Sequence, residues 1–154
     1  AKTSLSLDEV LDFCRGRMAV NVELKSDKDE ARARETGAAV AARLAARGRG
    51  DFYISSFWWS ALESARSTAP TVRRAFLFSD SPDRAALLAS AKAQGLWALH
   101  PERMYVTQEL IKAAHAASLR VNTWTVNDAK EIATFRNWSV DGIMSDFPER
   151  VPKD

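Results

Sequence analysis

This 154-residue sequence has little cysteine, no long apolar run and no cluster of charges of one sign. Its single cysteine, Cys14, excludes an internal disulfide, and the helical spacing of the neighbouring apolar residues predicts that Cys14 is a buried small hydrophobic residue. No stretch approaches the roughly 18 unbroken apolar residues of a membrane span. The 22 basic and 20 acidic residues are interspersed, which argues against binding to nucleic acid or to an anionic membrane surface.

Familiar catalytic and targeting motifs are also missing. The sequence has no metal-binding set of cysteines, no glycine-rich phosphate loop and no nucleophile elbow. Its first residues lack the apolar region of a signal peptide, which favours the cytoplasm over the periplasm. If a segment precedes Ala1, a signal peptide would lie in that segment. The sequence does not indicate an oligomeric state.

Short β-like runs alternate with longer helical runs along the whole chain. Runs rich in β-branched or aromatic residues predict strands at Met18–Lys25, Phe52–Phe57, Val72–Phe78, Leu96–His100, Arg120–Val126 and Val140–Ser145. Segments rich in Ala, Leu, Arg and Glu predict helices at Leu7–Arg15, Glu30–Arg47, Trp59–Ser67, Pro82–Gln94, Thr107–Ala117 and Asp128–Asn137. This order predicts an α/β fold of parallel βαβ units. Composition alone does not distinguish an open flavodoxin-like sheet from part of a (β/α)8 barrel, which needs eight strands and ~250 residues.

Local signals mark several helix ends. Thr107 and the pair Asn127 and Asp128 offer side-chain oxygens to the free amides at the start of a helix. Gly95 ends the helix at Pro82–Gln94, and Gly50 follows the longest helix. These signals are independent of the hydrophobic periodicity and support the same helix boundaries.

The first predicted strand carries the strongest indication of a site. Period-two alternation places Asn21, Glu23 and Lys25 on one face and apolar residues on the other. A parallel sheet covered by helices normally has apolar residues on both faces, and ligand sites form at the carboxyl ends of its strands. Glu23 could therefore ligate a divalent cation, and Lys25 could neutralise a phosphate oxygen. The alternative is a structural Glu–Lys pair on a solvated strand.

Two further residues at strand ends are candidates for a pocket. Trp124 shares a face with Asn122, and its indole ring could form a pocket wall against the carbon atoms of a polyol, although a core tryptophan is the more common role. His100, at the end of a strand, is better placed for chemistry than His115 on a helix. For either histidine a structural role is the expected one.

Five segments in register resemble the glycerophosphodiester phosphodiesterase family. The matching segments are Asn21–Lys25 (N-V-E-L-K), Ile54–Phe57 (I-S-S-F), Leu99–Pro101 (L-H-P), Val121–Asn127 (V-N-T-W-T-V-N) and Val140–Pro148 (V-D-G-I-M-S-D-F-P). The family is a (β/α)8 TIM barrel, so the resemblance implies that the six predicted strands are its third to eighth. Residues 1–154 would then be the C-terminal portion of one barrel domain, with the first two strands expected before Ala1.

The resemblance also implies roles for individual residues. Glu23 matches a carboxylate ligand of a divalent cation (Mg, Ca or Mn), Lys25 the lysine at the phosphate, and Trp124 an aromatic residue beside the glycerol site. Phe57 is expected in the same pocket. His100 replaces the asparagine that is usual in the family. The family's remaining catalytic residues, including both acid–base histidines, belong to the first two strands and are not in this sequence.

Two hypotheses of function follow. The first is metal-dependent hydrolysis of small-molecule glycerophosphodiesters to glycerol 3-phosphate and an alcohol, with this chain alone inactive. The second is a naturally short, catalytically inactive α/β module that binds a phosphate ligand or a partner protein.

Overall fold

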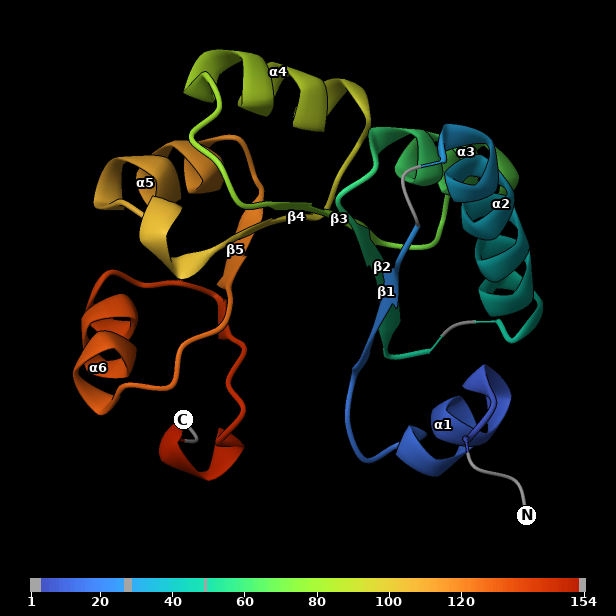
Figure 1. The fold of residues 1–154 in the computed structure, drawn as a ribbon, viewed down its shortest axis with the longest axis horizontal. Helices are drawn as coiled ribbons and strands as arrows, with labels where there is room; N and C mark the ends of the chain where they lie inside the picture. Colours follow the sequence, from blue (N-terminus) through green and yellow to red (C-terminus); the bar gives the residue numbers. More distant parts are fainter. Residues whose placement is uncertain (1–3, 27–28, 49, 153–154) are drawn as a thin grey trace.

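The computed structural model describes residues 4–26, 29–48 and 50–152. It contains a curved parallel sheet with helices along its outer side (Figure 1). The strands are β1 (Val20–Leu24), β2 (Phe52–Ser56), β3 (Arg74–Phe78), β4 (Ala98–Pro101), β5 (Arg120–Thr123) and β6 (Gly142–Ile143). The helices are α1 (Leu7–Cys14), α2 (Glu30–Ala46), α3 (Trp59–Thr68), α4 (Arg84–Ala93), α5 (Gln108–Ala116) and α6 (Ala129–Asn137), with 3-10 turns η1 (Arg103–Tyr105) and η2 (Pro148–Arg150).

The sheet is parallel throughout and follows chain order from β1 to β6. Figure 1 shows it curled into an arch, with the helices on the convex side and the concave side open. Within the described residues, β1 and β6 each pair on one side only. This arrangement is part of a (β/α)8 barrel, because an open flavodoxin-like sheet would carry helices on both faces.

The hydrophobic core lies between the convex face of the sheet and the helices. Leu44, Leu62 and Ile111 of the helices pack with Ile54 and Leu99 of the strands, and all are at most 2% exposed. Removing this apolar surface from water is the main stabilising contribution. Cys14 is buried in α1, as predicted.

Helices α2 and α3 pack closely where α2 carries a glycine. A Cβ atom at Gly37 would overlap the carbonyl oxygen of Ala61 in α3. Glycine costs about 0.5–1 kcal/mol relative to alanine within a helix. The residue at position 37 is therefore explained by this contact and not by helix propensity.

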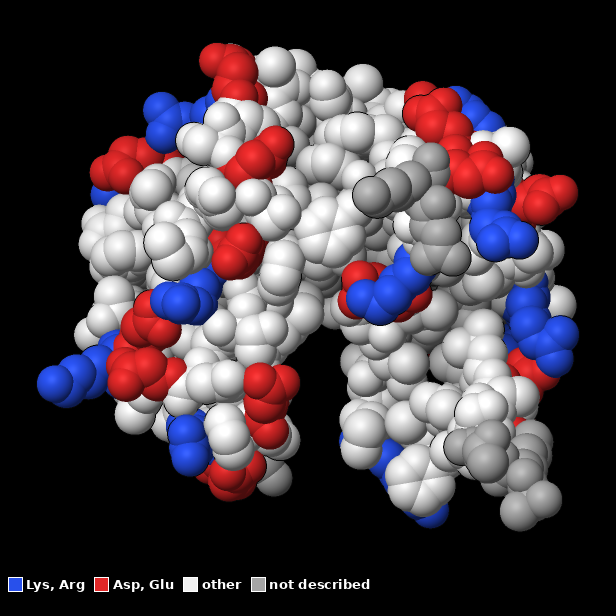
Figure 2. Space-filling model, in the orientation of Figure 1, with Lys and Arg blue, Asp and Glu red and all other residues white. Residues whose placement is uncertain are grey.

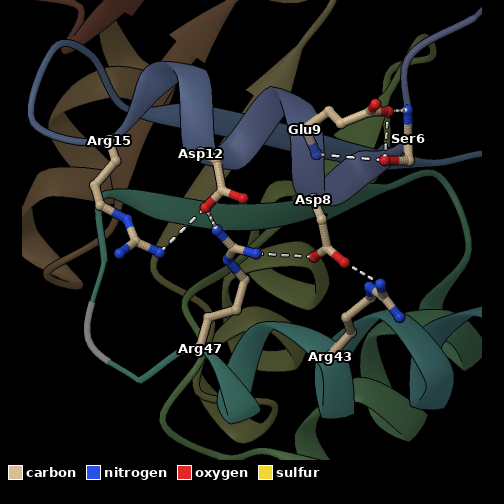
Figure 3. Close-up of polar contacts among 7 residues, drawn as sticks. All are labelled: Ser6, Asp8, Glu9, Asp12, Arg15, Arg43 and Arg47. Carbon is tan, nitrogen blue, oxygen red and sulfur yellow. Dashed lines mark hydrogen bonds and ion pairs between the residues drawn. The ribbon is translucent and has the colours of Figure 1, made fainter.

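Helix α1 is held against α2 by ion pairs (Figure 3). Asp8 pairs with both Arg43 and Arg47, with 3.0 Å between its Oδ1 and Arg47 Nη1, and Asp12 pairs with Arg47 and, at 3.3 Å, with Arg15. The Arg43 guanidinium lowers the pKa of the Asp8 carboxyl. At the start of α1, the Ser6 hydroxyl accepts a hydrogen bond from Glu9 N at 3.3 Å, and the Glu9 carboxylate accepts one from Ser6 N at 2.7 Å.

Most predicted helix ends are confirmed. Thr107 Oγ1 accepts from Leu110 N at 3.1 Å, and Asp128 Oδ1 accepts from Lys130 N at 2.9 Å. Gly95 follows α4 with φ +58°. The prediction for Asn127 was wrong: its Oδ1 accepts from Ser145 Oγ and Asp146 N, both at 3.0 Å, so it ties the chain after β6 to the chain after β5.

The strand ends also differ from the prediction. Strand β6 contains only Gly142 and Ile143, β5 ends at Thr123, and β2 ends at Ser56. Beyond these ends the regular ladder gives way to single backbone contacts, such as the bridge between Trp124 and Glu102 and the hydrogen bond from Met144 N to the carbonyl oxygen of Thr123. Phe57 and Trp124 therefore lie just after their strands and not within them.

Charged side chains are spread over the outer helices without a continuous patch of one sign on the face drawn in Figure 2. The same view shows a wide hollow between the two arms of the arch. None of the helices in the described part of the chain combines the length and the apolar character needed to cross a bilayer.

Candidate active site

The predicted polar pair of β1 lies at the carboxyl edge of the sheet. Glu23 alternates with the more buried Val22 and Leu24, as the period-two pattern predicts. Lys25 Nζ donates to Glu23 Oε1 at 2.8 Å, and their side chains are 80% and 33% exposed, respectively. This contact agrees with both alternatives from the sequence, since a structural pair and an accessible ligand pair would share it.

Phe57 and Trp124 meet above the concave face of the sheet. Their ring centroids are 5.6 Å apart and their planes are nearly perpendicular, at 87°. They follow β2 and β5, which are not neighbours in the sheet, so the contact depends on the curvature of the arch. Phe57 also comes directly after the paired residues Leu24 and Ser56, which places it beside Lys25. The structure thus places all four predicted site residues at the carboxyl edge of the sheet.

Backbone and indole hydrogen bonds fix the position of Trp124. Its Nε1 donates to the carbonyl oxygen of His100 at 2.8 Å, and its backbone forms an isolated parallel bridge with Glu102. The side chain is half-buried, whereas Phe57 is 41% exposed. The two rings therefore present one sheltered and one accessible aromatic surface, which is the kind of wall that packs against carbon atoms of a ligand.

His100 is fully buried, with 0% exposure. Its Nε2 lies 3.0 Å from Asn122 Nδ2, and its ring meets the Tyr53 ring edge-on at 5.7 Å. Burial lowers the pKa of His100 from 6.5 to about 4, so the imidazole is neutral at physiological pH. His115, on α5, lies 2.8 Å from Asp141 through its Nε2 atom. These contacts support the expected structural role of both histidines.

Sequence reasoning missed the polar residues below the aromatic pair. Tyr53 and Ser55 alternate with the core residue Ile54 and lie on the concave side, and the Ser55 hydroxyl is buried without a hydrogen-bond partner among the described residues. The period-two pattern in β2 was the signal that could have identified them. Asn122 packs against Gly142, where a Cβ atom would come within 2.6 Å of Asn122 Oδ1.

A divalent cation needs more ligands than these residues offer. Calcium and magnesium take about six oxygen ligands or more. Among residues 4–26, 29–48 and 50–152, no group of three or more His, Cys, Asp or Glu side chains could hold a metal ion. Glu23 can supply one carboxylate, and a complete cation site would require ligands from outside the described residues.

Comparisons with known proteins support one family. The model of the glycerophosphoryl diester phosphodiesterase family matches residues 2–150. A glycerophosphodiester phosphodiesterase of Bacillus altitudinis is 33% identical over 105 residues, which are 65% of this chain and 41% of that protein.

Solved structures agree. A Silicibacter pomeroyi DSS-3 protein assigned as a glycerophosphoryl diester phosphodiesterase has a TM-score of 0.81 and 34% identity over 94% of this chain and 54% of its own. An Oleispira antarctica phosphodiesterase, solved with the product sn-glycerol-3-phosphate, has a TM-score of 0.76 and 27% identity over 87% of this chain and 53% of its own. The chain thus spans about half the length of the relatives it matches. With its half-barrel fold and the match over residues 2–150, the chain belongs to the glycerophosphoryl diester phosphodiesterase family.

Proposed function

We propose that this chain forms part of an enzyme that hydrolyses glycerophosphodiesters to glycerol 3-phosphate and an alcohol. The observation that carries the proposal is the convergence of an acid, a base and two aromatic rings at the carboxyl edge of a half-barrel whose family is known. The Oleispira relative, which binds sn-glycerol-3-phosphate, supports the product class.

Each side chain has a distinct part in this proposal. Lys25, 80% exposed, places an accessible positive charge where it can approach a phosphoryl oxygen and stabilise the negative charge that develops during displacement. Trp124 and Phe57, which contact each other and are half-buried and 41% exposed respectively, pack against the glycerol carbons. The proton transfers belong to groups outside these residues, because His100 is buried and neutral.

We also propose that Glu23 supplies one oxygen ligand to a divalent cation, Mg, Ca or Mn. The accessibility of its carboxylate and its position on the concave side support this role. The further ligands and the two strands needed to close the barrel would come from residues outside this chain, an assignment that the two singly paired edge strands favour. The cation, when bound, would neutralise charge on the phosphodiester oxygens.

The test uses protein expressed from the complete reading frame that encodes these residues. Its intact mass is measured first, and release of glycerol 3-phosphate from glycerophosphocholine is then assayed with and without a chelator. A mass well above 17.1 kDa with chelator-sensitive activity is the expected result. A mass of 17.1 kDa without activity would support the alternative, a short module that binds phosphate or a protein partner.

Variants connect the activity to the site. Glu23→Gln and Lys25→Met are each expected to lower kcat by about 100-fold or more, the effect typical of removing a group that stabilises transition-state charge. Glu63→Gln is the matched control, because Glu63 forms a similar exposed ion pair with Arg34 at 3.2 Å between α3 and α2. Equal effects of the control and of Glu23→Gln would contradict the proposed site.

A further inference from the structure

We infer that His100 is a positioning residue that fixes the orientation of Trp124 through a trio of side chains, the buried His100 and Asn122 and the half-buried Tyr53. This inference rests on the proposed function, because Trp124 is the proposed glycerol contact. The trio joins β4, β5 and β2 on the concave side, and the contact between Phe57 and Trp124 lies further toward the carboxyl edge of the same strands.

The bonds within the trio define the state of each ring. Asn122 Nδ2 lies 3.0 Å from His100 Nε2, so Nε2 accepts a hydrogen bond with the amide in this orientation, while the buried Nδ1 has no hydrogen-bond partner among the described residues. Burial raises the pKa of the Tyr53 hydroxyl, and the interaction of this hydroxyl with the Asn122 side chain opposes that shift. All three groups are therefore uncharged over the ordinary pH range, and the geometry does not change with protonation near neutrality.

Two connections lead from this trio to Trp124. The carbonyl oxygen of His100 accepts the indole hydrogen bond at 2.8 Å, and Asn122, bound by the His100 ring, precedes Trp124 by two residues in the same chain segment. Pro101, the next residue, accepts hydrogen bonds from Trp124 N at 3.3 Å and from Thr123 Oγ1 at 3.2 Å. A shift of β4 relative to β5 would thus move the indole ring.

Substitution of His100 by glutamine or by asparagine distinguishes a hydrogen-bonding role of this side chain from simple filling of space. The terminal amide of glutamine reaches the position of Nε2, the atom that bonds Asn122, whereas the shorter asparagine reaches only the position of Nδ1. His100→Gln should therefore preserve the bond, and His100→Asn should lose it. Both variants remain polar and neutral.

The experiment uses the full-length protein and reads the indole N–H resonance of Trp124 by NMR, assigned by its loss in Trp124→Phe. In His100→Asn we expect this resonance to shift while those of Trp59 and Trp138, which pack against Phe76 and Phe135 and not against the trio, stay in place. We also expect KM for glycerophosphocholine to rise about tenfold, the effect of one lost buried hydrogen bond, with kcat changed less than about twofold. His100→Gln should stay within about twofold for both constants.

Several outcomes would overturn the inference. It fails if His100→Asn leaves the Trp124 resonance in place, or if His100→Gln disturbs it as much as His100→Asn does. Should His100→Asn not fold, Tyr53→Phe removes one hydroxyl of the trio and must shift the same resonance. The NMR result does not need catalysis, so an inactive natural protein would refute the proposed function while this test of His100 still stands.

Discussion

Burial of His100 predicts that the protein loses stability as the pH falls from neutrality toward 4. In the folded protein its pKa is lowered from 6.5 to about 4 by burial. Below pH 6.5 the unfolded chain binds a proton on this imidazole, whereas the folded chain does so only near pH 4, so acidification favours unfolding. Each pH unit between the two values is worth ~1.4 kcal/mol. The free energy of unfolding should therefore fall by roughly 3 kcal/mol, with most of the loss present at pH 4 and the remainder below it.

Urea unfolding between pH 7 and pH 4 measures this loss, with His100→Gln as the reference. The variant keeps His115 and every carboxylate, so subtracting its pH profile from that of the natural protein isolates the one buried imidazole. The natural protein should lose roughly 3 kcal/mol more than the variant over this range. Parallel profiles would mean that His100 titrates in the folded state at its ordinary pKa, and the assignment of a buried, neutral imidazole would then be wrong.

Three further predictions concern stability. Arg74 is buried and donates to the carbonyl oxygens of four residues, Pro70, Val72, Gln94 and Gly95. Arg74→Met should therefore lower the free energy of unfolding by about 3 kcal/mol in urea titrations, and a change below about 1 kcal/mol would contradict this role. Gly37→Ala should destabilise by about 1–3 kcal/mol through its clash with Ala61, although Ala is the better helix former, and a rise in melting temperature would refute the clash. Gly142→Ala should displace the Asn122 side chain and lower the melting temperature. An unchanged melting temperature would show that β6 can shift enough to accommodate the added methyl group, which would contradict this prediction.

The local elements were predictable because their causes lie within a few residues of one another. The alternation in β1 placed Glu23 and Lys25 on the polar face, and Thr107 and Asp128 begin their helices by the side-chain bonds that residues of these types make. Asn127 was wrongly predicted to cap the following helix, because its hydrogen-bond partners, Ser145 and Asp146, lie near it only after folding.

The family resemblance added what composition could not. The alternation of strands and helices is compatible with both a flat and a closed sheet, and it was the five matching segments that implied a barrel. The curled sheet and the match to residues 2–150 confirm that implication. The roles of Glu23, Lys25, Trp124 and Phe57 are still predictions, to be tested by the variants described above.

By itself, the sequence determined the order and type of the elements and which face of β1 is polar, because hydrophobic periodicity and capping act over single turns and single strands. Only the tertiary structure decided that Phe57 meets Trp124, that Tyr53 and Asn122 surround His100, and that this histidine is neutral. These contacts join strands far apart in the chain. They depend on the curvature of the whole sheet, which sums small rotations between neighbouring strands and is not encoded at any one position.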